Sequence, residues 1–241
     1  MRSDDLNLNN YHTDKIESGY LAFYDPIFTP LAWDPVLLLE IGVLDGESLR
    51  LWRDFFPKSA IVGIDIKLPE NFEPGERLNI FEGSQTDLKF LNEVSEKVAP
   101  DGFDIIIDDA SHIGELTRTT FWYLFDHHLK PGGIYVIEDW GTGYWGDWPD
   151  GKKFKSKPSL LSRTWSKLLK CHTLISKLPV KIPLPSHNYG MVGLIKQLID
   201  EQGAADLSRG ELAGKPGRPS KFSKMLIYPS LVFIYKTDTV L

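Results

Sequence analysis

The chain has 241 residues and a mass of 27.4 kDa, 42% of its residues are hydrophobic, and its formal net charge is −6 at pH 7. These values are typical of one globular domain with a full core, and the single cysteine, Cys171, excludes an internal disulfide and a cysteine metal cluster. Because the N-terminus is polar and no run of about 18 uncharged apolar residues occurs, we expect a cytoplasmic protein without a membrane span.

The first 140 residues alternate apolar runs of strand length with segments of helical period. This pattern predicts βαβ units and a parallel sheet. The expected strands are residues 36–41, 60–66, 78–82, 103–108 and 134–138. The expected helices between them are residues 46–56, 87–98 and 115–128.

The alternation stops after Asp139, and about 45 residues rich in Trp, Gly, Pro and Lys precede a further helix at residues 191–202. A connection of this length is typical of a functional or a mobile segment. Residues 160–178 within it could form a basic amphipathic helix. Residues 209–220 are expected to be a loop, and residues 224–236 to be two strands folded back at Pro229 as an antiparallel edge.

Positive charge is concentrated in the long connection. Residues 152–181 contain nine Lys or Arg and no acid, so the rest of the chain carries −15. Such a segment could attract a phosphorylated acceptor, a membrane surface or nucleic acid. A solvated surface segment is the simpler interpretation, and we expect no nucleic-acid partner.

The turn after the first expected strand and the end of the second predict a nucleoside site. Gly42 would let a ligand approach the backbone, and Gly46 would open a helix whose free N–H groups suit a carboxylate or adenosine. Their spacing departs from the dinucleotide fingerprint, which disfavours NAD. Asp65 lies about 20 residues downstream, where such a sheet needs an acceptor for ribose hydroxyls. A tight structural turn is the alternative for the glycines.

Two further strands end in carboxylates. Asp108 and Asp109 follow one apolar run, with His112 three residues further on, and Glu138 and Asp139 follow the next. Because the carboxyl ends of parallel strands line the ligand crevice, these side chains are expected to converge. A divalent metal with a nearby base is one interpretation. Solvated acidic turn residues, with Asp109 as a helix cap, are the other.

Two other groups of residues have open interpretations. Gln85, in the turn after the third expected strand, could hydrogen-bond an adenine, or the turn could simply cap the next helix. Aromatic residues that follow the acidic pair could stack on a sugar or aromatic acceptor, or could pack over the sheet edge. They are Trp140, Tyr144, Trp145 and Trp148.

In these motifs the chain resembles class I S-adenosylmethionine-dependent methyltransferases. It is particularly similar to the magnesium-dependent sugar O-methyltransferases of macrolide antibiotic biosynthesis, within the group often labelled cephalosporin hydroxylase-like. The resemblance rests on residues 11–15, 39–56, 83–87, 104–140 and 230–236. It implies one α/β domain over residues 1–241, with a Rossmann-like, doubly wound, mostly parallel seven-stranded sheet. It also implies an N-terminal helical segment at 1–30 and a lid-like insertion at 141–188.

The resemblance also assigns roles to site residues. S-adenosylmethionine would be contacted by Glu40, Gly42, Asp65, Gln85 and Asp108. Mg²⁺ would be held by Asp109, Glu138 and Asp139, and His112 would be the general base. One departure is Ser18, since relatives often carry a histidine just before Gly19-Tyr20.

The residue types suit this chemistry. Methyl transfer to a hydroxyl needs a proton acceptor, and His112 can serve near neutral pH. A hard cation such as Mg²⁺ takes carboxylate ligands and lowers the pKa of bound hydroxyls. Strand alternation argues against both Glu138 and Asp139 facing the metal, in which case one of them supports the other ligands.

The expected function is therefore metal-assisted O-methylation of a small molecule, with a sugar-containing natural product as acceptor. One alternative is a metal-independent methyltransferase in which His112 acts alone. Another is a non-enzymatic module that binds nucleic acid or membrane through residues 152–181. The sequence is compatible with a homo-oligomer and does not identify the acceptor.

Overall fold

The computed structural model describes residues 1–70, 72–73, 75–154, 186–204 and 219–238. Most of the basic segment 152–181, the expected helix 160–178, most of the expected loop 209–220 and Cys171 lie outside the described residues. No helix of the described part is both long and apolar enough to cross a membrane.

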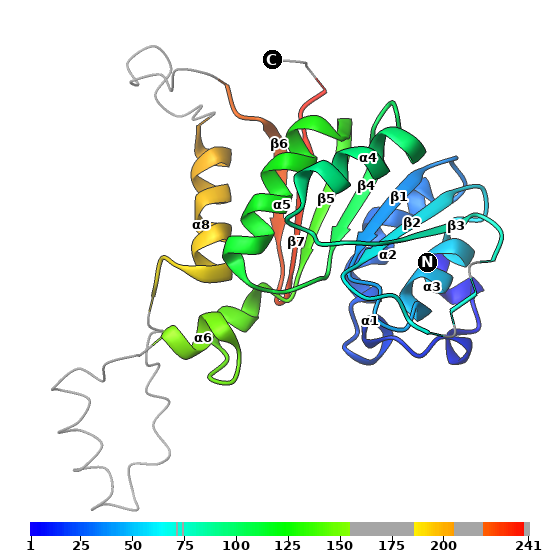
Figure 1. Cartoon of the computed structure of the whole chain (residues 1–241), viewed down its shortest axis with the longest axis horizontal. Helices are drawn as coiled ribbons and strands as arrows, with labels where there is room; N and C mark the ends of the chain where they lie inside the picture. Colours follow the sequence, from blue (N-terminus) through cyan, green and yellow to red (C-terminus); the bar gives the residue numbers. More distant parts are fainter. Residues whose placement is uncertain (71, 74, 155–185, 205–218, 239–241) are drawn as a thin grey trace, which may run out of the picture.

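Seven strands of the described chain form one sheet, in the order β3-β2-β1-β4-β5-β7-β6 (Figure 1). The strands are β1 Leu37–Ile41, β2 Ala60–Asp65, β3 Leu78–Glu82, β4 Phe103–Asp108, β5 Leu129–Glu138, β6 Phe222–Ile227 and β7 Leu231–Lys236. The first five are parallel, and β7 runs antiparallel to both β5 and β6. The expected mostly parallel sheet with an antiparallel edge is confirmed, although the reversed strand is β7 and the outermost strand is β6.

Helices cover both faces of the sheet. They are α1 Asp14–Glu17, α2 Leu21–Phe28, α3 Glu47–Phe55, α4 Leu88–Val98, α5 Gly114–His127, α6 Pro149–Lys153 and α8 Gly190–Gly203, with short 3-10 helices at η1 Arg2–Asp5, η2 Leu8–Asn10, η3 Thr29–Leu31 and η4 Trp140–Tyr144. The helices α4, α5 and α8 lie together on one face (Figure 1), and α2 and α3 pack on the other.

Strand alternation divides the core in two. In β1, Leu39 and Ile41 face the side of α4, α5 and α8, whereas Leu38 faces α2 and α3. Rings of Tyr24 and Trp52 meet edge to face at 5.0 Å on the α2 side. Because side chains alternate along each strand, this two-sided core also decides which acids at the strand ends share a face.

The expected element bounds agree with the structure except in β5. This strand begins at Leu129 rather than 134, because Leu129 pairs with Phe103 across an irregularity between Phe103 and Ile105. Lys130 also binds the Asp104 carboxylate at 2.9 Å, which ties the early part of β5 to β4. The other predicted strands and helices that fall within the described residues are confirmed to within two residues at each end.

Candidate methyltransferase site

A cavity of about 560 Å³ opens at the carboxyl ends of β1, β2 and β4. Segments distant in sequence form its wall, among them residues 12–14, 42–45, 64–66, 83–85 and 109–112. In the sheet, Asp108 pairs with Ile41 of β1 and with Ile137 of β5. The ends of the three central strands therefore lie side by side at one edge, next to the cavity.

Gly42 is required by the closeness of the first turn to the loop after β4. Its φ is +98°, and a Cβ at this position would lie 2.1 Å from the carbonyl oxygen of Asp109. The Asp109 amide in turn donates to the Ile41 carbonyl at 2.8 Å. Only glycine fits here, because both the backbone conformation and the available space exclude a side chain.

Asp65 stabilises the first turn from the end of β2. Its Oδ2 accepts hydrogen bonds from the amides of Val43, at 2.7 Å, and Leu44, at 3.1 Å. Leu44 has a positive φ of 51° and is 84% exposed. Asp65 thus fixes the backbone of the turn that carries the exposed Leu44 side chain. Both Asp65 and Leu44 line the cavity.

The residues predicted to contact the cofactor fall into two sets. Gly42, Asp65 and Gln85 line the cavity, whereas Glu40, Gly46 and Asp108 are not among its lining residues. Gly46 precedes α3 with a φ of +85°. Glu40, Gly46 and Asp108 can therefore affect the cavity only through the neighbouring residues that line it.

Glu40 and Asp108 are both buried behind the wall. Glu40 accepts from the Ser48 hydroxyl at 2.9 Å. Asp108 accepts from the Tyr135 hydroxyl at 3.1 Å and from the Ala110 amide, and burial raises its pKa to about 7. Asp108 lies on the α5 side of the sheet, so it supports the loop that follows it rather than facing the crevice.

Asp109, His112 and Asp139 form an open group at the crevice. One ligand atom of each lies within 4.8 Å of the others. The His112 Nε2 is 3.6 Å from Asp109 Oδ1 and 3.9 Å from Asp139 Oδ2. The side chains of Asp109 and His112 are each 14% exposed and that of Asp139 is 17% exposed, so solvent can reach the group.

Glu40, Asp109 and Glu138 form a second, buried group that surrounds the Lys15 ammonium. The Nζ atom lies 2.6 Å from Asp109 Oδ2 and 3.0 Å from both Glu40 Oε1 and Glu138 Oε1. Lys15, Glu40 and Glu138 are fully buried. Asp109 is the member that the open and buried groups share.

Burial and charge act in opposite directions on these groups. Burial alone would lower the pKa of Lys15, but Asp109, Glu138 and Glu40 outweigh it and hold that pKa well above the usual value. Burial raises the pKa of Glu138 well above its ordinary range, Asp109 adds to the rise, and Lys15 opposes it. Burial also raises the pKa values of Glu40 and Asp109, and Lys15 again opposes the rise.

Two tyrosines near the start of α2 hold the second acidic pair. The Tyr24 hydroxyl donates to Glu138 Oε1 at 2.5 Å, and the Tyr20 hydroxyl donates to Asp139 Oδ1. Glu138 Oε2 is buried and has no hydrogen-bond partner among the described residues. Each acid thus keeps one carboxylate oxygen that no tyrosine occupies.

Backbone conformation turns His112 and Asp139 toward each other. Their φ angles are +50° and +52°, which is unusual for residues other than glycine. The His112 carbonyl accepts from Thr142 Oγ1 at 3.2 Å and from Trp148 Nε1 at 3.1 Å. Residues that follow β5 therefore fix the loop that follows β4.

Sequence reasoning missed Lys15, Tyr20, Tyr24 and Thr142 as site residues. Lys15 was part of the motif at residues 11–15 but had no role assigned to it. The two tyrosines are four residues apart, a helical spacing that places side chains on one face. That spacing was the available signal, although it does not by itself indicate what the hydroxyls contact.

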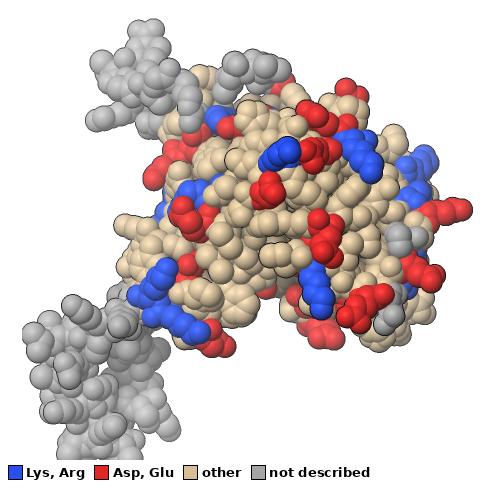
Figure 2. All heavy atoms as spheres, viewed as in Figure 1, with Lys and Arg blue, Asp and Glu red and all other residues tan. Residues whose placement is uncertain are grey.

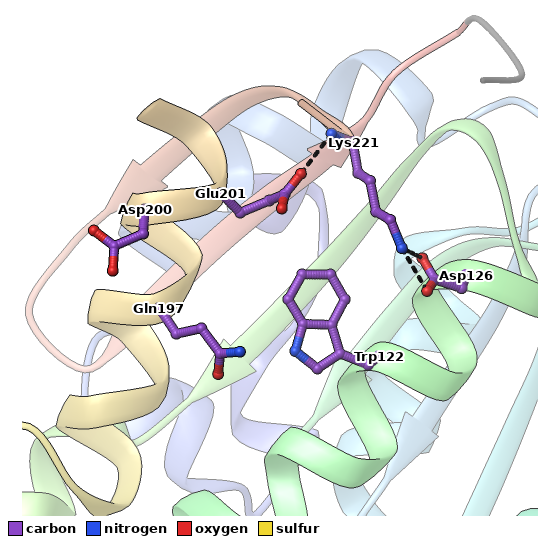
Figure 3. A pocket seen from close by; sticks show the side chains of 6 residues that line it. All are labelled: Trp122, Asp126, Gln197, Asp200, Glu201 and Lys221. Carbon is purple, nitrogen blue, oxygen red and sulfur yellow. Dashed lines mark hydrogen bonds and ion pairs between the residues drawn. The ribbon is translucent and has the colours of Figure 1, made fainter. Parts of the chain in front are cut away.

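Other surface features do not resemble this site. A second hollow of about 450 Å³ lies between α5 and α8, where Lys221 pairs with Asp126 beside Trp122 (Figure 3). None of the predicted site residues lines it. On the face shown in Figure 2, acidic and basic side chains are interspersed.

Comparison with known proteins gives relatives of the chain. No family model matches the chain. It is 42% identical over 148 residues to mycinamicin VI 2''-O-methyltransferase of Micromonospora griseorubida, covering 57% of this chain and 36% of that protein. It is 41% identical over 163 residues to demethylmacrocin O-methyltransferase of Streptomyces fradiae, covering 61% of this chain and 40% of that protein.

A solved structure of the mycinamycin-pathway methyltransferase MycE, in complex with Mg and SAH, matches with a TM-score of 0.64 and 30% identity. The match covers 90% of this chain and 48% of MycE. The chain shares the α/β methyltransferase fold of MycE. The matches cover less than half the length of each of these relatives.

Proposed function

We propose that this chain carries an S-adenosylmethionine-dependent O-methyltransferase activity that acts on a sugar hydroxyl of a small natural product with the help of a divalent metal. The observation that carries this proposal is the position of Asp109. It lines the nucleoside-sized cavity and also belongs to the open acidic group with His112 and Asp139. A methyl donor in the cavity and a hydroxyl at the acids would therefore meet at one residue.

The cavity wall suits an adenosine-containing donor. Gly42 and Asp65 both line the cavity, and an acid at the end of the second strand would accept hydrogen bonds from ribose hydroxyls. Gln85, whose Nε2 donates to the Thr120 hydroxyl at 3.2 Å, also lines the cavity and would supply a polar contact for the adenine. We assign direct cofactor contacts to these three residues. Glu40 and Asp108 contribute by holding Ser48 and Ala110, which line the cavity.

The acids fit a divalent metal. Asp109 Oδ1 and Asp139 Oδ2 face the open group, and Glu138 Oε2 is a buried carboxylate oxygen without a described partner. Oxygen donors of this kind are those that Mg²⁺ prefers. Asp109, Asp139 and Glu138 would hold the ion, which when bound lowers the pKa of a coordinated hydroxyl. Glu138, which is turned toward Lys15 and Tyr24, would also support the other two.

His112 would act as the general base. Its imidazole borders both the cavity and the acids, so it can reach a hydroxyl that attacks the methyl carbon. The hydroxyl oxygen forms the new bond to carbon as the sulfonium bond breaks, and the proton passes to the neutral imidazole. Asp109 and Asp139 then lie close enough to stabilise the imidazolium. The products are the methyl ether and S-adenosylhomocysteine.

The acceptor class is supported by the relatives. MycE has been solved with Mg, SAH and mycinamycin VI, and it is 29% identical to this chain over 90% of the chain's residues. Another relative, 38% identical over 132 residues, methylates a rhamnosyl-tetracenomycin. We therefore propose a glycosylated small molecule as the partner of this site.

Calorimetry and a methyl-transfer assay test the proposal. S-adenosylhomocysteine should bind the protein, and transfer of a radioactive methyl group to a panel of glycosylated macrolides and polyketides should require Mg²⁺ and stop with EDTA. Asp109→Asn should abolish metal-dependent turnover. His112→Ala should lower kcat by about 100-fold or more while binding of S-adenosylhomocysteine changes little.

Asp101→Asn is the matched control, because Asp101 is an exposed aspartate in the turn before β4, away from the crevice. It should leave both binding and turnover unchanged. Failure of the unmodified protein to bind S-adenosylhomocysteine would contradict the proposal. Full metal-dependent activity in Asp109→Asn would contradict the site assignment.

A further inference from the structure

The Lys15 ammonium occupies the position at which three acidic side chains converge. It belongs to the short helix α1, yet it reaches the ends of β1, β4 and β5 through Glu40, Asp109 and Glu138. Its side chain is fully buried. A buried ammonium is costly unless it is well paired, so this arrangement needs ionised carboxylates around it.

Strand alternation explains why the three acids share one side. The core residues Leu38 of β1, Ile107 of β4 and Val136 of β5 all face α2 and α3. Each acid lies two residues further along, at Glu40, Asp109 and Glu138, and therefore projects from the same face. Without a cation between them, these carboxylates would repel one another.

Lys15 occupies one oxygen of each of two acids and leaves the other oxygen available. It binds Asp109 Oδ2 and Glu138 Oε1. Asp109 Oδ1 faces His112 instead, and Glu138 Oε2 has no described partner. The ammonium therefore fixes both carboxylates, leaving Asp109 Oδ1 in the group that opens on the crevice and Glu138 Oε2 buried without a described partner.

Lys15 is also continuous with the cavity wall. The three residues before it, His12, Thr13 and Asp14, line the cavity. Thr13 caps α1, with its hydroxyl accepting from the Lys15 amide at 3.4 Å. A single residue thus anchors the N-terminal wall to the acids.

We propose that Lys15 is a built-in cation that supplies part of the charge needed by the acid cluster and so competes with a divalent metal for the same carboxylates. This inference rests on the metal site of the proposed function. Once Glu40, Asp109, Glu138 and Asp139 are all ionised, their charge exceeds that of one ammonium by three, so a divalent cation is still attracted. The fixed ammonium nevertheless keeps the cluster folded when no metal is bound.

The consequence is a measurable competition between the two cations. If Lys15 is replaced by the apolar Lys15→Met, the divalent metal becomes the main source of positive charge for the cluster. The metal should then stabilise the variant more than it stabilises the unmodified protein, with about tenfold tighter binding. A residue needed only for packing would lower stability equally with and without metal.

Thermal unfolding in EDTA and in saturating Mg²⁺ tests this inference. In EDTA, Lys15→Met should unfold about 10 °C or more below the unmodified protein. Its rise in Tm on addition of Mg²⁺ should exceed that of the unmodified protein by about 5 °C or more. Lys58→Met, which removes an exposed lysine, should show the same Mg²⁺ response as the unmodified protein.

A second variant keeps the test decisive if Lys15→Met does not fold in either buffer. Lys15→Met combined with Glu40→Gln removes one charge of each sign. The amide oxygen introduced by Glu40→Gln would still accept from the Ser48 hydroxyl, so this protein should fold and respond to Mg²⁺ like the unmodified one. Equal Mg²⁺ responses in Lys15→Met and the unmodified protein would overturn the inference, as would a double variant that does not fold. Absence of any Mg²⁺ response in the unmodified protein would instead contradict the metal in the proposed function.

Discussion

The indole Nε1 of Trp148 donates to the backbone carbonyl of His112 at 3.1 Å, across 36 positions of the chain. Thr142 donates to the same oxygen at 3.2 Å. His112 has a left-handed backbone, which is costly for a residue with a side chain and persists only when neighbours hold it. The segment after β5 therefore controls the direction of the imidazole.

Thr142→Val should weaken catalysis more than cofactor binding. The substitution keeps the shape of a fully buried side chain but removes one of the two donors to the His112 carbonyl. We expect kcat to fall about tenfold and the free energy of unfolding to fall by about 1 kcal/mol. Steady-state kinetics, binding of S-adenosylhomocysteine and urea unfolding measure these three effects.

The matched control for this substitution is Thr119→Val on α5. Thr119 is exposed and donates to the carbonyl of Glu115 within its own helix, so the same chemical change occurs away from the site. It should leave kcat unchanged. A kcat for Thr142→Val equal to that of Thr119→Val would show that the carbonyl contact does not position His112.

Gly42→Ala should disrupt the fold at the site. The added Cβ would lie 2.1 Å from the Asp109 carbonyl oxygen, and φ at this position is +98°. We expect a loss of about 3 kcal/mol or more in the free energy of unfolding, together with loss of S-adenosylhomocysteine binding. Gly141→Ala is the control, since nothing lies within 4 Å of a Cβ there, and similar unfolding curves for the two variants would refute the prediction.

Asp108→Asn should remove a pH dependence of stability. Burial raises the pKa of Asp108 to about 7 in the folded protein, whereas an unfolded aspartate has a pKa of about 4. The folded state therefore holds the proton more tightly. This contribution to stability is fully present below about pH 4 and is lost as pH rises through about 7.

The asparagine variant should thus gain stability relative to the unmodified protein between pH 4 and 8, by up to about 4 kcal/mol. The amide oxygen can still accept from Tyr135, so packing is retained. Urea unfolding in EDTA across this pH range is the measurement. A difference between the two proteins that does not change with pH would mean that Asp108 ionises normally.

Most of the fold could be predicted because its signals are local. A short apolar run such as residues 103–108 predicts a buried strand by itself. The glycine at position 42 is likewise explained by the local backbone geometry of its turn. The start of β5 could not be predicted in the same way. Pairing of Leu129 with Phe103 depends on an irregularity in β4 and β5 that no local pattern indicates.

The candidate site was partly predictable for the same reason. The sequence predicts that Asp109, Glu138 and Asp139 lie near one another, and alternation indicates that the last two diverge. It does not indicate that Asp139 has a left-handed backbone or that Glu138 faces a buried ammonium. Lys15 contacts residues 25, 94 and 123 positions away, and such a contact follows only from the packing of the whole chain.

The rings of Phe154 and His187 lie 4.3 Å apart, centre to centre. Nearby, the Asp150 carboxylate accepts from the amides of Gly114 and Met191, which anchors both ends of this junction to α5 and α8. Phe154 and His187, which lie 33 positions apart in the sequence, are thus close neighbours in the fold. For protein engineering, Phe154 and His187 therefore mark two neighbouring splice points, and any segment joined at both has only a short distance to bridge.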